Sequence, residues 1–299
     1  MSAKLQPAKV DLITTGTLLP TIKKLAGHWD EWGNPLRQNL HQNMPRIPLT
    51  QKASWRKAVY FPGCRQLDRR PDLILDAFKL LDFLRVDNVV PYSEPEICCG
   101  LPLYQAGLKE EFQRHAKLMV SRLSKYKKII CPCPACAHTF KVLYRKIAPG
   151  LTRKIMHLTE IIWPKLARRE AAPIQNQRIA YHDPCYLGRH LGIYDIPRRI
   201  LSHVGYQIIE FIWAREQAGC CGGGGSVDLN FPELADLVAG RRIEEALLID
   251  FDYLATACPG CLTRLGDAGK DSGLKVKDIT ELVMRALFNL PESSPEGIL

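Results

Sequence analysis

The sequence has no long hydrophobic run. No charge-free apolar stretch among its 299 residues approaches the roughly 18 residues that a membrane-spanning helix needs. Hydrophobic residues make up 46% of the chain and charged residues 24%, which is typical of a soluble globular protein. We therefore expect no transmembrane segment.

A secretory signal is also missing. The residues from Met1 to Lys9 do not lead from basic side chains into an apolar stretch and a small-residue cleavage site. This absence predicts a cytoplasmic protein and leaves attachment to the inner membrane through partners open. Because cytoplasmic thiols stay reduced, the eleven cysteines are not expected to form a disulfide framework.

No recognisable nucleic-acid-binding module accompanies the basic charge of the chain. Its 41 basic and 31 acidic residues give a formal net charge of +10. Basic pairs such as Arg198-Arg199 and Arg241-Arg242 are spread along the chain, and most are expected to be solvated surface. The charge fits an anionic small molecule or an acidic protein surface, and nucleic acid is not expected as a partner.

Cysteine, by contrast, is abundant and repeats in one pattern. A lone cysteine is followed by Cys-Cys-Gly and then by Cys-x-x-Cys, with 33 and 34 residues before the pair and 33 and 36 after it. A repeat of this length predicts two similar domains. The first set is Cys64, Cys98, Cys99, Cys133 and Cys136, and the second is Cys185, Cys220, Cys221, Cys258 and Cys261.

Strand-like and helix-like segments alternate around both sets. This alternation predicts an α/β fold, with two tandem pseudo-repeated α/β domains that carry their cysteines on loops at a sheet edge and face an interdomain cleft. The predicted strands are 57–64, 128–130, 178–185 and 253–257, and the predicted helices are 72–84, 109–126, 197–204 and 232–248.

The domain boundaries follow from composition. Residues 1–55 carry no cysteine and are predicted to form an N-terminal helical arm or docking segment, with a helix-like stretch from Leu12 to Leu25. The first cysteine-rich domain is expected at 56–170 and the second at 171–290, joined by a polar linker at 168–177. Residues 291–299 are expected to be a flexible tail.

Five thiols per set favour an iron-sulfur cluster over zinc. A structural zinc ion takes four ligands in a closed tetrahedron, so one thiolate of each set would be left over. Iron-sulfur clusters offer several iron corners, each of which takes a thiolate. Zinc in one or both sets, within a protein that only assembles a complex, remains an alternative at this point.

The doubled pattern resembles the CCG cysteine-rich domain found in the catalytic subunits of heterodisulfide reductases, over about residues 56–270. The resemblance implies that each five-cysteine set holds a noncubane [4Fe-4S] cluster, with the two sets as ligands. It also implies that a disulfide substrate is cleaved between the clusters. No catalytic side chain is assigned by this reasoning.

Three further features stay open. Cys131 has no counterpart in the second half, where Thr256 stands, and is expected to be a buried small hydrophobe. The glycine run 221–226 is expected to direct N–H groups at cluster sulfides, with a phosphate loop as the weaker interpretation. His182 and His190 flank Cys185 and could donate protons or only hydrogen-bond locally.

Many proteins of this kind carry a ferredoxin module ahead of the repeats, but no ferredoxin cysteines precede Cys64 here. The resemblance therefore implies a separate ferredoxin-like subunit, with a flavoprotein beyond it, in a hetero-oligomeric complex. The segment before residue 55, in which Gly33-Asn34-Pro35 resembles the junction after such a module, is the expected docking site.

Two redox functions are compatible with these features. The favoured one is a heterodisulfide reductase-like subunit that reduces or forms a disulfide on a small molecule or a carrier-bound sulfur substrate. The alternative is an electron-transfer subunit between a flavin dehydrogenase of the glycolate, lactate or glycerol-3-phosphate type and quinone. The sequence does not give the substrate, the direction, the catalytic cluster or the stoichiometry of the complex.

Overall fold

Two similar parallel sheets form the framework of the computed structural model, which describes residues 20–48 and 57–290. The strand order is β2-β1-β3-β4 in the first sheet and β6-β5-β7-β8 in the second. The repeat of the cysteines is thus matched by a repeat of the topology, and the predicted α/β fold is confirmed. The strands are β1 (Ala58–Tyr60), β2 (Val89–Pro91), β3 (Lys128–Cys131), β4 (Ile155–His157), β5 (Arg178–Tyr181), β6 (Gln207–Ile209), β7 (Tyr253–Thr256) and β8 (Val276–Asp278).

The central strands are apolar because helices cover them. Val59 in β1 pairs with Val90 on one side and Ile129 on the other, and Val59 and Ile129 are fully buried. Ala180 occupies the corresponding place in β5. Parallel strands need crossover connections, which here are helical and place apolar side chains on the sheet faces.

Helices connect the successive strands of both halves and follow the last strand of each sheet. None of those in the described part of the chain is long and apolar enough to cross a membrane. In the first half they are α3 (Gly63–Arg69), α4 (Asp72–Phe83), α5 (Leu101–Gln105), α6 (Lys109–Leu123), α7 (Pro134–Lys141), α8 (Pro149–Thr152) and α9 (Leu158–Leu166). In the second half they are α10 (Asp195–His203), α11 (Val227–Asn230), α12 (Pro232–Ala246), α13 (Pro259–Gly269) and α14 (Ile279–Phe288).

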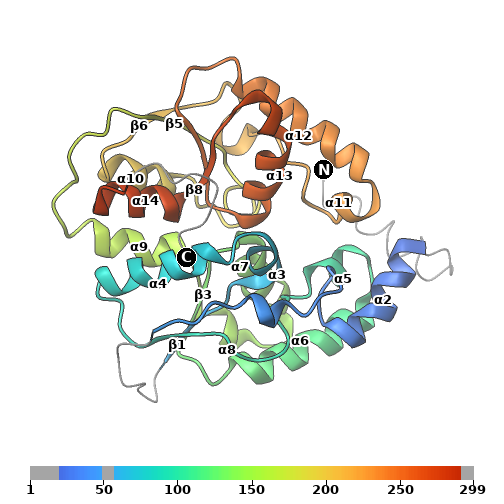
Figure 1. The fold of residues 1–299 in the computed structure, drawn as a ribbon. Helices are drawn as coiled ribbons and strands as arrows, with labels where there is room; N and C mark the ends of the chain where they lie inside the picture. The colour runs from blue at the N-terminus through green and yellow to red at the C-terminus, as the bar shows by residue number, and fades with distance from the viewer. Residues whose placement is uncertain (1–19, 49–56, 291–299) are drawn as a thin grey trace.

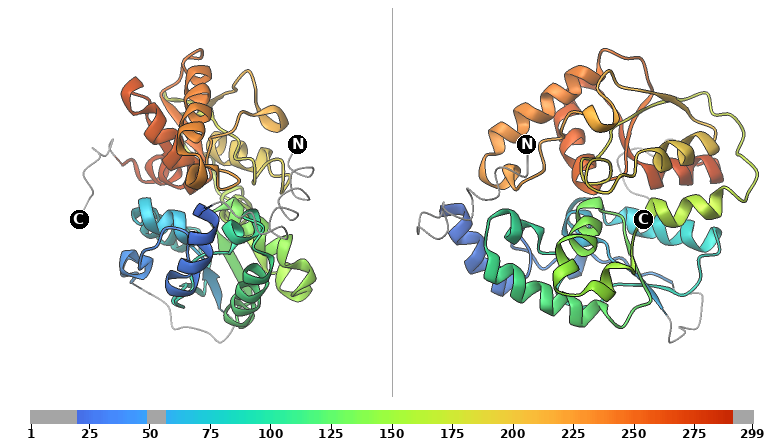
Figure 2. Two further views of the ribbon diagram at one scale, coloured as in Figure 1. Left: turned by 90° about the vertical axis from the view of Figure 1, so that its right-hand side faces the viewer. Right: turned by 180° about the vertical axis from the view of Figure 1, so that it is seen from behind.

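The two halves pack through helices. Helix α9 packs against α10, and α4 packs against α14 (Figures 1 and 2). The rings of Phe83 and Phe288 lie 5.0 Å apart at the second contact. Many buried apolar residues from both halves, such as Leu81 and Leu282, belong to one continuous hydrophobic cluster, and a second, smaller cluster that includes Leu254 lies in the second half. Burial of each such leucine contributes about 1.5–3 kcal/mol, so this contact fixes one half against the other.

The last strand of each sheet leads directly into a capped helix. His157, the last residue of β4, caps α9, and Asp278, the last residue of β8, caps α14 by accepting a hydrogen bond of 2.8 Å from the backbone N–H of Thr280. Such caps satisfy N–H groups that have no partner within the helix. The equivalence of the two caps extends the repeat beyond the cysteine motifs.

The N-terminal segment packs on the first half. Helix α2 (Pro20–Trp32) lies beside α6 (Figure 1), and the 3₁₀ helix η1 (Leu40–Asn43) packs against α3. Both Trp29 and Leu40 are buried. The helix predicted from Leu12 to Leu25 is described only from residue 20 onward, because residues 1–19 lie outside the described residues. So does the predicted tail at 291–299.

The predicted helices agree with the structure to within a few residues at their ends, but the placement of all cysteines on loops was wrong. Cys64 lies in the first turn of α3, and Cys136 and Cys261 lie in the first turns of α7 and α13. Pro134 and Pro259 explain the difference for the two Cys-x-x-Cys motifs, since proline at the first helical position is preorganised to start a helix.

Candidate metal centre

The cysteines lie where the parallel strands end. Cys64 follows β1, the Cys98-Cys99 pair follows β2, and Cys133 follows β3, with the same order after β5, β6 and β7 in the second half. In open parallel sheets the crevice beyond the carboxyl ends of the strands is where ligands bind. The fold therefore brings residues about 35 residues apart in the sequence to one edge of each sheet.

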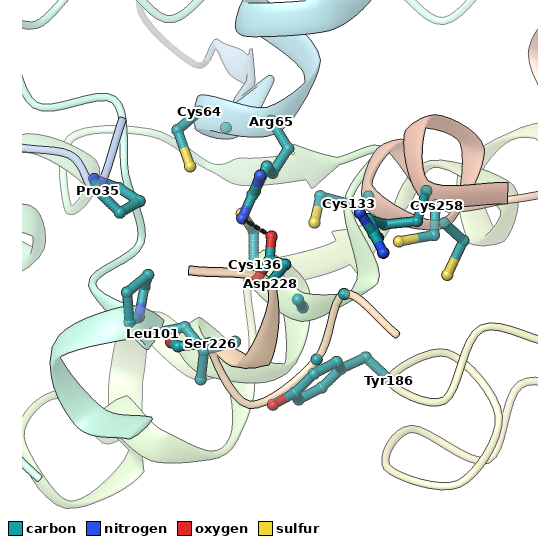
Figure 3. A pocket seen from close by; sticks show the side chains of 18 of the residues that line it. Pro35, Cys64, Arg65, Leu101, Cys133, Cys136, Tyr186, Ser226, Asp228 and Cys258 are labelled. Carbon is teal, nitrogen blue, oxygen red and sulfur yellow. Dashed lines mark hydrogen bonds and ion pairs between the residues drawn. The ribbon is translucent and has the colours of Figure 1, made fainter. Parts of the chain in front are cut away.

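The two sets share one cavity, here called the cysteine cavity. It measures about 120 Å³ and is lined by nine of the ten predicted ligands, drawn from both halves of the chain. The tenth, Cys220, is hydrogen-bonded through its thiol to Cys185 and Cys221. Figure 3 shows Cys64, Cys133, Cys136 and Cys258 around this space.

All five cysteines of the first set are buried. The Sγ atoms of Cys64 and Cys98 are 3.7 Å apart, and burial followed by the contact with Cys64 raises the pKa of Cys98. Hydrogen bonds from Cys136 and then from Cys98 lower the pKa of Cys99 well below its ordinary value. The thiol of Cys99 also lies 3.7 Å from Thr139 Oγ1.

The second set makes a similar network. Hydrogen bonds from the thiols of Cys185 and Cys221 lower the pKa of Cys220 to about 2, while the contact with Cys220 raises the pKa of Cys221 to about 12. The backbone N–H of Gly222 donates to Cys220 Sγ at 3.4 Å. Each set thus contains a thiol that is stabilised as a thiolate, the form that binds metals.

The two Cys-x-x-Cys motifs meet across the halves. Cys133 and Cys258 are the N-cap residues of α7 and α13. Hydrogen bonds from Cys136 and then from Cys258 lower the pKa of Cys133, and the backbone N–H groups of the first turn add to the effect. Helix N-termini present such unpaired N–H groups to negative charge.

A glycine after each cysteine pair holds the loop in a left-handed conformation. Gly100 and Gly222 both have φ of 81°. A Cβ atom on Gly222 would lie 2.2 Å from the carbonyl oxygen of Ala235, and one on Gly100 would lie 2.7 Å from His115 Cδ2. Only glycine combines this φ with this close approach, which explains the third residue of the Cys-Cys-Gly motif.

The donor set fits an iron-sulfur cluster. All eleven cysteines lie within the described residues, and all are free thiols. Ten of them converge on the cysteine cavity. Any side chain at position 63 would crowd this site, because a Cβ atom on Gly63 would come to 2.9 Å from Cys136 Sγ. Soft thiolates in this number are suited to iron-sulfur or zinc chemistry.

His182 is buried beside the second set. One of its ring nitrogens and the Sγ atoms of Cys221 and Cys261 lie within 4.8 Å of one another, a grouping that could also hold a metal ion. Its Nδ1 accepts a hydrogen bond of 3.2 Å from Arg242 Nε. Burial, and then the positive charge of Arg242, lower its pKa to about 3.

Two arginines that were grouped with surface charges are buried. Arg242 is 2% exposed, stacks on the ring of Phe211 and forms an ion pair with Glu245. Arg198 is 7% exposed and binds both carboxylate oxygens of Asp183, at 2.7 and 2.8 Å. The solvated-surface prediction was wrong for these two, because a bidentate or stacked guanidinium is stable inside the protein when it is paired.

His190 and Cys131 lie away from the thiol network. His190 is exposed and stacks on Tyr186 at 4.6 Å between ring centroids, with His138 next to both rings. Cys131 is fully buried at the end of β3, and burial raises its pKa well above the ordinary value. It is a buried small side chain, as predicted.

The N-terminal segment reaches the first set through hydrogen bonds. Trp29 Nε1 donates to His115 Nδ1 at 3.2 Å, and His115 Nε2 in turn lies 2.8 Å from the carbonyl oxygen of Cys98. Pro35, from the segment that resembles a ferredoxin junction, lines the cysteine cavity. Sequence reasoning did not find this connection, because it joins residues 86 positions apart.

Comparison with known proteins follows the same division of the chain. The family model "Cysteine-rich domain" (CCG) matches residues 58–141 and 179–266. The chain belongs to the CCG cysteine-rich domain family. Each matched region contains the first three strands of one sheet and all five cysteines of one set. The predicted family is therefore confirmed.

Several proteins of known type are similar to this CCG protein. A subunit of the dihydromethanophenazine:CoB–CoM heterodisulfide reductase of Methanosarcina barkeri is 33% identical over 81% of the chain. A subunit of the fumarate reductase (CoM/CoB) of Methanothermobacter marburgensis is 29% identical over 75%, and the EtfAB:quinone oxidoreductase of Syntrophomonas wolfei is 32% identical over 64%. All three are named as redox proteins.

The CCG protein spans only part of these relatives, namely 61%, 45% and 29% of their lengths. Among solved structures, the glutamate racemase RacE1 of Bacillus anthracis aligns with a TM-score of 0.38 and 14% identity, over 80% of this chain and 82% of the racemase. That likeness is too weak to bear on either fold or function.

Proposed function

We propose that the chain is an iron-sulfur subunit of an oxidoreductase, and that the cysteine cavity is an interdomain cleft where two clusters face each other. Each cluster is a noncubane [4Fe-4S] centre, held by one of the two five-cysteine sets, and the domain division lies at the linker 168–177. The observation that carries the proposal is the convergence of both sets on one cavity, with Cys133 beside Cys258.

The substrate that this cavity suits is a disulfide. Reduction breaks one S–S bond, takes up two electrons and two protons, and yields two thiols. Bound iron-sulfur clusters of this kind supply electrons one at a time and an iron corner for sulfur. The protein's own contribution is to bury most of the thiols away from water and to hold the two cysteine sets side by side in one cavity.

The glycine run after Cys221 is better suited to hydrogen-bond the sulfur atoms of a cluster than to bind a phosphate group. The N–H of Gly222 points at Cys220 Sγ, and a Cβ atom on Gly223 would lie 3.7 Å from Cys221 Sγ. N–H groups that donate to ligand sulfurs stabilise negative charge on them and thereby raise the reduction potential of the bound cluster. We assign the glycines this function.

The electrons come from partner proteins in our proposal. A ferredoxin-like subunit supplies them, with a flavoprotein subunit beyond it, and the segment before residue 55, which includes α2 and η1, is the docking site. The hydrogen bonds from Trp29 to His115 and from His115 to the carbonyl of Cys98 support this assignment, since they join that segment to the first set.

One observation favours the alternative of an electron relay to quinone. The cysteine cavity measures about 120 Å³, whereas pockets for small-molecule ligands are typically about 300–1,000 Å³. A subunit that only passes electrons between partners needs no larger space. The two functions differ in whether sulfur compounds reach the clusters.

The experiment that separates them uses the anaerobically purified full chain with its clusters. A small disulfide, 3,3′-dithiodipropionate, is added to the reduced protein and the electron paramagnetic resonance spectrum is recorded. We expect a changed signal and release of 3-mercaptopropionate with an artificial electron donor. An unchanged spectrum without thiol release would contradict disulfide chemistry and leave the relay.

A further inference from the structure

A short segment of the second half covers the cysteine cavity. This segment, residues 222–231, contains the glycines after Cys221 and helix α11, and is called the strap below. Ser226, Asp228 and Leu229 of the strap line the cavity together with the cysteines. Helix α11 of the strap packs against α12 on its other side.

Two polar contacts tie the strap to the first half. The guanidinium of Arg65, the residue after Cys64, forms an ion pair with Oδ2 of Asp228 in α11, and this pair spans the cavity in Figure 3. Ser226 Oγ donates to Gln105 Oε1 at 3.1 Å. Because Arg65 and Gln105 belong to the first half, both contacts close the cavity across the two domains.

The ion pair is incomplete on the side of Asp228. Its side chain is only 8% exposed, yet Oδ1 is buried without a hydrogen-bond partner among the described residues. A buried carboxylate with one unsatisfied oxygen loses part of the stabilisation that a fully paired one has. Another anion that satisfies both of its oxygens can therefore compete with Asp228 for Arg65.

The strap has a hinge where it leaves the second cysteine pair. Gly222 packs closely, because a Cβ atom there would lie 2.2 Å from the carbonyl oxygen of Ala235. Gly224 has open space around it, and Gly225 has a left-handed φ of 68° with only a side-chain contact to Val227. Glycine allows rotation at such positions with little steric cost, so 224–225 can turn while the cysteines stay in place.

We propose that Arg65 binds an anionic group of the substrate, and that Asp228 occupies the position of this anion until the substrate displaces it and opens the strap. This inference names the substrate class for the proposed function and rests on it: a thiol or disulfide that carries a carboxylate or similar oxyanion. Arg264 also lines the cavity; it pairs with Asp236 through Nη2, but its Nε has no hydrogen-bond partner among the described residues, and this Nε supplies a second donor for the oxyanion.

The test compares two small thiols that differ in charge, 3-mercaptopropionate and 2-mercaptoethanol, by calorimetric titration of the anaerobic cluster-containing protein. We expect the anionic thiol to bind more tightly. The Arg65→Gln variant should weaken its binding about tenfold or more and leave 2-mercaptoethanol unchanged, and Asp228→Asn should tighten it. Equal affinities, or no effect of Arg65→Gln, would overturn the proposal.

A matched control exists one helical turn further along α3. Arg69 pairs with Asp267 of α13 at 3.0 Å, also across the two halves, but both side chains are about half exposed and neither lines the cavity. Asp267→Asn should not alter the affinity for either thiol. If it tightens the binding of 3-mercaptopropionate as much as Asp228→Asn does, general charge and not the strap is responsible.

A competition on the unchanged protein avoids any dependence on variants that fold poorly. Propionate should displace 3-mercaptopropionate, and 1-propanol should not; failure of propionate to compete contradicts the anion site. These experiments test the anion site separately from the proposed disulfide reaction. Binding that depends on Arg65 without reduction of dithiodipropionate supports the anion site and refutes the proposed reaction, and reduction without dependence on Arg65 does the reverse.

Discussion

Cys133 and Cys258 come from different halves of the chain, and their thiols form a hydrogen bond in the middle of the molecule. This contact is the main cause of the raised pKa of Cys258. It places the N-termini of α7 and α13 against each other, so the two cysteine sets lie side by side and not at opposite ends of the protein. Chemistry that needs both sets at once has a place to occur.

The two halves should lose their clusters separately. We expect Cys98→Ser and Cys220→Ser each to lower the iron content by about four atoms per chain, because each removes a ligand from one set. Iron analysis and electron paramagnetic resonance of the purified variants measure this. Cys131→Ala, which changes a buried cysteine outside the cavity, is the matched control and should retain the full iron content.

The glycine after the second pair should be indispensable. Gly222→Ala requires both a left-handed φ and a Cβ atom 2.2 Å from the carbonyl of Ala235, so we expect a loss of roughly 2 kcal/mol or more and poor cluster retention. Gly224→Ala, two residues further, meets nothing within 4 Å. Chemical denaturation should show it within about 0.5 kcal/mol of the parent protein; equal effects of the two would contradict the assignment.

The buried ion pair of the second half should matter more than an exposed one. Asp183→Ala leaves the guanidinium of Arg198 paired with Glu210 alone, in a site where the side chains of Arg198 and Asp183 are less than 10% exposed, and should cost about 1.5–3 kcal/mol of unfolding free energy. The half-exposed pair between Arg69 and Asp267 should contribute less than about 1 kcal/mol. Urea unfolding of Asp183→Ala and Asp267→Ala compares them directly.

Asp278 should make stability depend on pH. Burial raises its pKa to about 6 from an ordinary 3.8, opposed by Thr280 and by Arg70 and assisted by Glu281. The folded state therefore holds this proton more tightly than the unfolded chain does, so the free energy of unfolding falls as pH rises from about 4 to about 6. Above that range the cost is constant, on the order of 3 kcal/mol at most.

The variant Asp278→Asn isolates this effect, since its side-chain oxygen can still cap α14. We expect the stability difference, variant minus parent, to be larger at pH 7 than at pH 4.5. Urea titrations of both proteins at the two pH values measure it. A difference that does not change with pH would mean that Asp278 is ionised throughout and that its burial is compensated.

These particular residues show how far the sequence predicts the structure. The cysteine motifs predicted that each set gathers at one edge of its sheet, because parallel strands place their carboxyl ends together. The contact of Cys133 with Cys258, and that of Arg65 with Asp228 across 163 residues, depend on how α4 and α9 pack against α14 and α10, which no local pattern encodes. The three-residue strands β2, β4, β6 and β8 are too short for a clear alternation.

Arg242 is the residue that closer attention to periodicity would have found. It stands in line with Ala235, Ala239 and Ala246 on the buried face of α12, and a charged side chain on a face of small apolar residues indicates a paired buried group. Asp228 had no such signal, since the four-residue helix α11 shows no periodicity. Its role is visible only in the structure, where it pairs with Arg65 in the cysteine cavity.

The most direct test of the central claim is the iron, acid-labile sulfide and zinc content of the anaerobically purified full chain. Two four-iron clusters predict about eight irons with a similar amount of sulfide and no zinc. About four irons with one zinc would assign one set to a structural site, for which His182 with Cys221 and Cys261 is the grouping at hand. Zinc alone, without iron, would contradict the proposal that this CCG protein is a redox subunit.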